Sequence, residues 1–385
     1  MTTSTAPATV NIFELMDRAR AREDVISMGL GDPDLATPDH IVAAAKEAIA
    51  DGRTGAAPPR GLLELRRAIA RKLAAENGVQ VDPGTEVLVT TGGQEALFLV
   101  IQALIDPGDE VVMPDPRYTS YDYTIELAGG RIVLVPTREE DAFDLDPDEV
   151  EKRLTPASKV LLLITPSNPT AGIITPANIR RLAEIAQERN LIVISDEIYE
   201  KFLYDDHQHL STASLPGMRE RTITLNGVSK TYAMTGWRIG YLAGPAPIVD
   251  AVAALKTMVN IQAPTVSQWA AVAALEGPQG CVGEMRETYD ARRRLLMAFL
   301  DEMGFTYGEP RGGLYIWVNS TAAGIPALEL SARFLDEGVL IFPGTGFGEN
   351  WGDYMRMTLL QPIDVVAEAI VRMKRALTKL REDQA

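Results

Sequence analysis

One short segment of the sequence combines two isolated charges with an otherwise apolar, small or hydroxylated composition. The segment NGVSKTYAMTGWRIGY covers residues 226–241, and Lys230 and Arg238 are its only fully charged residues. A lysine in apolar surroundings has a lowered amine pKa and can form a Schiff base as a nucleophile. An arginine eight residues further on could make a bidentate contact to a phosphate. Taken singly, a surface lysine and a salt-bridged arginine are the more common interpretations of these two residues.

Further polar residues follow apolar segments that have the composition of strands. Gly93 and Gln94 begin a helical pattern after EVLVT, and Asn168 follows KVLLLIT. Asp196 and Tyr199 come at and just after the end of LIVISD. Free N–H groups at a helix start favour an anion, although a tight turn would explain the two glycines of TGGQ as well. An unpaired carboxylate at the end of an apolar strand is costly, so we expect Asp196 to have a cationic partner.

These residues fall at strand ends, where open α/β sheets bind their ligands. Together they offer an amine, an anion site, a carboxylate, an amide and a phenol. Pyridoxal 5'-phosphate needs such partners for its aldehyde, its phosphate, its pyridine nitrogen and its 3-oxygen. The combination therefore predicts a pyridoxal phosphate site, although each residue alone is a weak signal.

The elements that must position these residues alternate between short apolar segments and amphipathic helical patterns. The apolar segments lie at residues 86–90, 110–114, 131–136, 159–165, 191–196, 222–226 and 238–244. This alternation predicts an α/β fold whose large domain has a doubly wound, mainly parallel, seven-stranded sheet. From about residue 285 the pattern changes to a long helix followed by mixed strands and helices. We predict a large cofactor-binding domain at 46–284 and a smaller α+β domain from 1–45 and 285–385.

Composition and charge exclude several classes of protein. The 385 residues carry 37 Lys and Arg against 53 Asp and Glu, a net charge of −16, so nucleic acid is not expected as a partner. Cys281 is the only cysteine, which excludes an intramolecular disulfide and a cysteine-based metal site. No apolar run approaches membrane-spanning length, and the first residues lack the pattern of a secretory signal. We therefore expect a cytoplasmic protein with no membrane partner.

Histidine chemistry is disfavoured because the sequence has only three histidines, His40, His207 and His209. This disfavours Ser-His-Asp hydrolysis and histidine-based dehydrogenation. The last two lie in DDHQH, which could indicate a metal cluster; we interpret it as a solvated loop and expect no metal site. No GxGxxG follows the first strand, so a Rossmann dehydrogenase is not expected either.

A series of motifs runs along nearly the whole chain: GLGDPDLATP, PPRGLLELRRAIA, TTGGQEAL, SNPT, SDEIY, SKTYAMTGWRIGY, PGTGFG and YMRMTL. In this order they resemble the class I/II aminotransferases, of the aspartate aminotransferase-like fold type I. The resemblance implies a pyridoxal-phosphate-dependent transfer of an amino group between an L-amino acid and a 2-oxo acid. It also implies a homodimer with the active site at the subunit interface.

The same resemblance assigns catalytic roles to residues of this chain. Lys230 matches the lysine that forms the Schiff base with the cofactor and then moves the substrate Cα proton. Asp196 matches the partner of the pyridine nitrogen. Tyr199 and Asn168 match the residues that hydrogen-bond the 3-oxygen, and Asn168 also belongs to the predicted substrate site.

The remaining assignments concern the two ends of the site and the cofactor ring. Tyr118 matches the aromatic residue that stacks on the ring. Arg356, in YMRMTL, matches the arginine that binds the substrate α-carboxylate, and Gly31 matches the backbone position beside it. Met355 and Met357 alternate with Arg356, which places the arginine on the other face of its strand. The phosphate would be held by Gly93, Gln94 and Arg238.

The chain departs from the family pattern at two phosphate contacts and leaves its substrate open. Ala56 stands where the family usually has a tyrosine that reaches the neighbouring subunit's phosphate, and Gly227 stands where a hydroxyl is common. Both changes predict weaker cofactor retention. Arg60 and Arg117 could receive a side-chain carboxylate, or could be solvated or pair with nearby aspartates. Aromatic, aliphatic and acidic donors all stay open.

Two other functions are compatible with the same motifs. A pyridoxal-phosphate-dependent β-lyase would eliminate a β-substituent, release ammonia and need no 2-oxo acid acceptor. A non-catalytic effector-binding domain would keep the fold without turnover. The intact Lys230 and the absence of a recognisable DNA-binding extension favour an enzyme.

Overall fold

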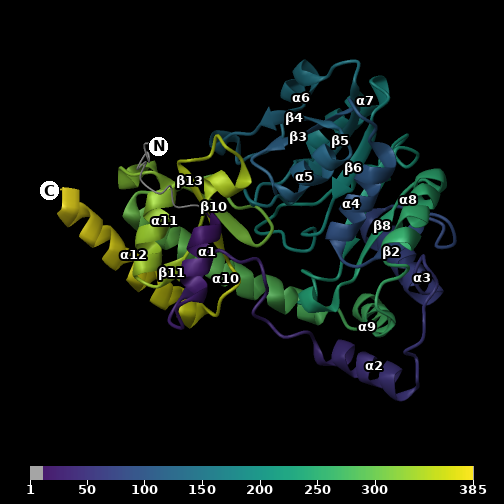
Figure 1. Ribbon diagram of the computed structural model, residues 1–385, viewed down its shortest axis with the longest axis horizontal. Coiled ribbons are helices and arrows are strands. Elements are labelled where there is room, and N and C mark those ends of the chain that lie inside the picture. The colour runs from purple at the N-terminus through teal and green to yellow at the C-terminus, as the bar shows by residue number, and fades with distance from the viewer. Residues whose placement is uncertain (1–11, 385) are drawn as a thin grey trace, which may run out of the picture.

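A seven-stranded sheet forms the centre of the larger part of the molecule (Figure 1). The computed structural model describes residues 12–384. The strand order is β2-β8-β7-β6-β5-β3-β4, and β8 alone is antiparallel to its neighbours. The strands are β2 (Val87–Thr90), β3 (Glu110–Asp115), β4 (Arg131–Pro136), β5 (Ser158–Ile164), β6 (Ile192–Asp196), β7 (Thr222–Gly227) and β8 (Gly240–Ala243). The predicted mainly parallel, seven-stranded sheet is confirmed.

Helices cover both faces of this sheet because its central strands are apolar on both sides. In β5, Leu162 packs on one face and Leu161 on the other, as the two-residue period of a strand requires. The first face packs against α4 (Gly93–Leu104), α5 (Ser120–Leu127) and α8 (Ala246–Val259). The opposite face packs against α6 (Pro147–Arg153) and α7 (Pro176–Glu188), and towards β2 against α2 (Asp39–Ala50), α3 (Leu63–Lys72) and α9 (Thr265–Glu276).

A smaller part of the molecule is built from the two ends of the described chain. Its four-stranded antiparallel sheet has the order β12-β13-β10-β9. A second, parallel pair joins β1 to β11 and so ties the N-terminal segment to the C-terminal one. The strands are β1 (Ile26–Ser27), β9 (Thr306–Tyr307), β10 (Tyr315–Asn319), β11 (Val339–Leu340), β12 (Phe342–Pro343) and β13 (Tyr354–Thr358).

Four helices complete this smaller part. They are α1 (Ile12–Arg20), α10 (Gly280–Met303), α11 (Ala327–Asp336) and α12 (Ile363–Gln384). In Figure 1 the purple α1 lies beside α11, which comes from the other end of the chain. The predicted domain boundaries near residues 46 and 285 fall inside α2 and α10, and they stay predictions. No helix within residues 12–384 is long and apolar enough to cross a membrane.

The two parts share one apolar core next to the carboxyl ends of the central strands. Tyr199 and Phe202, which follow β6, pack with Leu314 and Tyr315 of the smaller part. Buried Arg292 on α10 forms an ion pair with Asp34, with 2.7 Å between Nη1 and Oδ1. The strand ends that carry the predicted polar residues therefore face the smaller sheet.

Candidate active site

A cavity of about 620 Å³ lies where the strand ends of the large sheet meet the smaller part of the molecule. Its wall contains all ten residues that the sequence assigns to the cofactor and substrate sites: Gly31, Gly93, Gln94, Tyr118, Asn168, Asp196, Tyr199, Lys230, Arg238 and Arg356. The sequence places these residues up to 325 positions apart, from 31 to 356. The fold brings them to one site.

Lys230 lies three residues beyond the end of β7 and reaches across to the N-terminal segment. Its Nζ donates to the carbonyl oxygen of Gly31 at 2.5 Å. The side chain is half-buried, so the amine is open to the cavity. A primary amine at a cavity wall can react with a carbonyl compound bound there.

One end of the cavity has the features of an anion site. Helix α4 begins at Gly93, so the first N–H groups of the helix have no acceptor within it. Arg238 has a φ of +57° and so lies in the left-handed region, which residues other than glycine adopt rarely and at a cost in conformational energy. A Cβ at Gly92 would fall 2.5 Å from Arg238 Nη2, and a Cβ at Gly240 would fall 2.5 Å from Gly93 N. Gly92 thus leaves room for the guanidinium, and Gly240 lets the backbone of β8 approach the helix N-terminus closely.

Asp196 is held by hydrogen bonds without a counter-charge. Its Oδ2 accepts from the Tyr121 hydroxyl at 2.5 Å, and its Oδ1 accepts from the N–H of Ile198 at 3.1 Å. Burial raises the pKa of Asp196, and the Tyr121 hydrogen bond opposes this shift. Over residues 12–384, no lysine or arginine forms an ion pair with Asp196, so the predicted cationic partner is not a side chain there. A cationic ligand atom would fit this carboxylate.

The substrate end of the cavity is dominated by Arg356. Its Nη1 donates to Asn168 Oδ1 at 2.8 Å and its Nη2 to the Gly29 carbonyl at 2.5 Å. The guanidinium lies 4.3 Å from the Tyr315 ring centroid and 4.5 Å from that of Phe347. A buried, aromatic-lined guanidinium is suited to a carboxylate.

Two tyrosines of the site were missed by the sequence interpretation. Tyr121 lies three residues after Tyr118, and this spacing near the start of α5 could have indicated that both face the same region. Tyr315 lies in GGLYIWV, where it reads as an ordinary strand residue. Its hydroxyl lies 3.2 Å from that of Tyr199, and its ring lies beneath Arg356.

Three residues that the sequence left open lie outside this cavity wall. Arg60 forms an ion pair with Asp250 and donates to the Thr85 carbonyl. Arg117 is buried and pairs with Asp115 and Asp122, which is one of the three arrangements considered for it. Ala56 is solvent-exposed in this chain.

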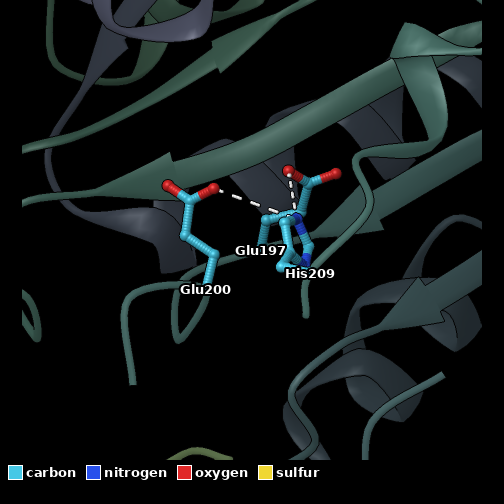
Figure 2. A group of neighbouring side chains, drawn as sticks. All are labelled: Glu197, Glu200 and His209. Atoms are coloured by element: carbon cyan, nitrogen blue, oxygen red, sulfur yellow. Dashed lines mark hydrogen bonds and ion pairs between the residues drawn. The ribbon is translucent and has the colours of Figure 1, made fainter. Parts of the chain in front are cut away.

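A second polar cluster lies behind the site and corrects one prediction. Figure 2 shows Glu197, Glu200 and His209 with contacts from the imidazole to both carboxylates. His209 Nε2 lies 3.0 Å from Glu197 Oε2, and its side chain is only 10% exposed. The prediction of a solvated loop is therefore wrong for His209. The sequence pattern failed because the partner carboxylates come from the turn after β6.

Both carboxylates of the cluster contact a basic side chain. Lys72 forms an ion pair with Glu200, and Asn226 Nδ2 donates to the same carboxylate at 2.8 Å. Burial alone would lower the pKa of His209, but Glu197 and Glu200 outweigh burial and raise it. The three ligand-type atoms lie within 4.8 Å of one another, and Lys72 already supplies a positive charge to Glu200.

Comparison with known proteins identifies the family. Residues 23–372 match the family model described as aminotransferase class I and II, and the chain belongs to this family. It is 42% identical to an aspartate aminotransferase of Pyrococcus abyssi and 40% identical to an aromatic-amino-acid aminotransferase of Thermococcus litoralis, over 95% of each chain. The crystal structure of an aromatic aminotransferase from Pyrococcus horikoshii superposes with a TM-score of 0.91 at 42% identity, covering 95% of this chain and 99% of that one.

The chain is therefore an aminotransferase, as its motifs predicted. The sheet and the additional smaller part agree with the fold of these relatives. Enzymes of this class transfer amino groups in amino-acid metabolism, so membership of the family favours an enzyme over a purely effector-binding protein.

Removal of the Tyr121 hydroxyl is expected to raise the pKa of Asp196 further. In Tyr121→Phe the carboxylate loses a hydrogen bond that stabilises its ionised form. The pKa can be followed by carbon NMR of labelled aspartate, with the Asp196 signal identified by its loss in Asp196→Asn. Tyr123→Phe, which alters an exposed tyrosine of the same helix, should leave the value unchanged. An unaltered Asp196 titration in Tyr121→Phe would contradict this interaction.

The His209 cluster predicts a stability contribution that depends on pH. The folded pKa of His209 is raised above its unfolded value of about 6.5, so its stabilisation is complete below that pH and is lost as pH rises through the folded pKa. We expect His209→Gln to lower the free energy of unfolding by about 1–3 kcal/mol at pH 6 and by less at pH 9.

Denaturant titrations of wild type and variant at both pH values measure this difference. His207→Gln serves as the control, because His207 is the more exposed histidine of the same loop. A wild-type-minus-variant difference that is equal at pH 6 and pH 9 would show that His209 is not protonated in the cluster.

Proposed function

We propose that this aminotransferase binds pyridoxal 5'-phosphate in the 620 Å³ cavity and uses Lys230 as its covalent attachment point. The observation that carries this proposal is the uncompensated Asp196 carboxylate in the same cavity as the Lys230 amine. Asp196 suits a protonated pyridine nitrogen, and Lys230 suits an aldehyde.

The anion site fits the phosphate of the same cofactor. Gly93 and Gln94 would direct N–H groups of the α4 N-terminus at it, and Arg238 would add a guanidinium. Loss of the hydroxyl at Gly227 and of the aromatic residue at Ala56 leaves Arg238 with a larger share of this binding. This follows from the family pattern and predicts weak cofactor retention.

The ring of the cofactor would lie between aromatic and polar groups. Tyr118 lines the cavity and is 39% exposed, which leaves its face available for stacking. Tyr199 and Asn168 would hydrogen-bond the 3-oxygen. Tyr121 would keep Asp196 in place through its hydrogen bond to the carboxylate, a role that the sequence did not suggest.

Arg356 would bind the α-carboxylate of the amino acid, beside the Gly31 backbone and Asn168. Its side chain is 5% exposed and already oriented by Asn168 and by two aromatic rings, so little conformational freedom is lost on binding. A bidentate hold on the carboxylate fixes the direction of the substrate Cα–H bond.

When bound, pyridoxal phosphate supplies an aldehyde for covalent attachment and a protonated ring that accepts negative charge. The work of the chain is to move one proton and to keep the reacting groups in place. The Lys230 amine, once free, takes the proton from the substrate Cα and holds it at Nζ. Asp196 keeps its negative charge near the ring nitrogen, and the Tyr199 hydroxyl donates towards the ring oxygen.

The amino donor and the 2-oxo acid acceptor are small molecules in this proposal. One similar protein is named for aspartate and another for aromatic amino acids, so we propose both acidic and aromatic amino acids as candidate donors. Neither Arg60 nor Arg117 lines the cavity, so neither is proposed to receive a side-chain carboxylate.

We also propose a homodimer with the cavity at or near its interface. Large apolar side chains are exposed on α5 and at the end of α8, including Tyr123 at 72% and Met258 at 86%. A group of large, exposed apolar side chains favours an interface in which a second subunit covers them. The cytoplasmic location stays a prediction from the sequence.

Transamination can be measured with a panel of phenylalanine, leucine and aspartate as donors and 2-oxoglutarate as acceptor. We expect formation of glutamate and of the donor's 2-oxo acid in equal amounts by the wild type with added pyridoxal phosphate. Lys230→Ala should lose activity by about 10²–10⁴-fold or more, because its proton carrier is gone. Lys379→Ala, a surface lysine on α12, is the matched control and should keep full activity.

The same assay, with β-chloroalanine added as a fourth substrate, distinguishes the proposed aminotransferase from a β-lyase. A β-lyase would release ammonia from β-chloroalanine without any 2-oxo acid and would form no glutamate from the three donors. Glutamate formation that survives in Lys230→Ala would overturn the role of Lys230.

A further inference from the structure

We propose that Tyr315 is a positioning residue of this active site: its hydroxyl donates to the Tyr199 oxygen and so directs the Tyr199 proton into the cavity. The inference rests on the proposed function, because it concerns the phenol assigned there to the cofactor's 3-oxygen. Neither the motifs nor the sequence assignments include Tyr315.

Tyr315 connects the two parts of the molecule at the cavity wall. It is the first residue of β10 in the smaller sheet, is 2% exposed and pairs with Thr358 of β13. Tyr199 comes from the turn after β6 of the large sheet. The hydroxyl oxygens are 3.2 Å apart, and the rings meet edge to face with centroids 6.0 Å apart. The hydrogen bond therefore bridges the parts that carry the cofactor and substrate assignments.

The direction of this hydrogen bond follows from the single proton that each hydroxyl carries, and the charges around the two phenols agree with it. Burial would raise the pKa of Tyr315, but the positive charges of Arg356 and Lys230 outweigh burial and lower it. Burial raises the pKa of Tyr199. Each hydroxyl has one proton to donate, so when Tyr199 donates to the cofactor's 3-oxygen as proposed above, the proton between the two phenol oxygens comes from Tyr315. The proton of Tyr199 is then free to be donated to another acceptor.

The Tyr315 hydroxyl also lies close to the backbone of Gly31, the residue that accepts a hydrogen bond from Lys230. A Cβ on Gly31 would fall 2.4 Å from Tyr315 Oη, so a side chain at position 31 would collide with this phenol. The Gly31 carbonyl in turn accepts the hydrogen bond from Lys230 Nζ. The ring of Tyr315 lies 4.3 Å from the Arg356 guanidinium carbon. The ring and the hydroxyl of Tyr315 thus have different contacts, so a variant can remove the hydroxyl and leave the ring in place.

Tyr315→Phe removes the hydroxyl and keeps the ring under Arg356. In the protein loaded with pyridoxal phosphate, we expect the pH midpoint of the visible absorbance change to rise by roughly half to one unit. A directed donor stabilises negative charge on the 3-oxygen, and its loss favours the protonated form of the bound cofactor. We expect kcat to fall about 3- to 10-fold while KM stays within about twofold, because the arginine remains packed.

Three further variants separate a positioning role from a merely structural one. Tyr289→Phe is the matched control, since the Tyr289 hydroxyl is buried, unpartnered and outside this cavity wall; it should titrate like the wild type. Tyr199→Phe should shift the midpoint in the same direction as Tyr315→Phe. The double variant should shift it no further than Tyr199→Phe alone, because Tyr315 acts through Tyr199.

Two outcomes would overturn the inference while leaving the proposed function intact. One is a Tyr315→Phe midpoint equal to that of the wild type. The other is a double variant whose shift equals the sum of the two single shifts. A wild-type chain that binds no pyridoxal phosphate would overturn both the proposed function and this inference.

Discussion

The site depends on a carboxylate that the protein leaves without a counter-charge. Asp196 ends a buried strand, and in the described part of the chain it accepts hydrogen bonds from Tyr121 and Ile198 but pairs with no lysine or arginine. Two hydrogen bonds reduce the cost of burying this charge without cancelling it, since burial still raises the pKa. A cationic pyridine nitrogen would complete the arrangement. Cofactor binding would then relieve an electrostatic cost that the folded chain carries by itself.

The other groups of the site divide between the two parts of the molecule. The large sheet supplies the anion site and Asp196 from a helix start and a strand end, and it supplies Lys230 from the turn after β7. The smaller part supplies Arg356 and Tyr315 from two paired strands. Lys230 and Gly31 connect the large sheet to the N-terminal segment. A substrate bound by Arg356 of the smaller part would thus lie next to Asp196 and Lys230 of the larger part. The Tyr199–Tyr315 contact would help to fix the relative position of the two parts.

Much of this arrangement could be predicted from the sequence because it follows from local patterns. The seven predicted apolar segments correspond to the seven strands of the sheet. Residues at or shortly after the strand ends line the cavity, and Asp196 and Lys230 are among them. Two of the misses, His209 and Tyr315, have a common physical cause. The role of His209 depends on carboxylates brought near it by the turn after β6, and the contacts of Tyr315 depend on packing between the two parts. Neither hydrogen-bond partner is encoded by spacing within a strand or helix, so no period could reveal them.

The proposed attachment point can be tested directly by trapping. The wild-type chain is incubated with pyridoxal phosphate, reduced with borohydride and digested, and the modified peptide is located by mass spectrometry. We predict one pyridoxyl group per chain, on Lys230, and its absence from Lys230→Ala treated in the same way. No stable adduct in the wild type, or an adduct mainly on another lysine such as Lys72 or Lys256, would contradict the assignment of this cavity to the cofactor.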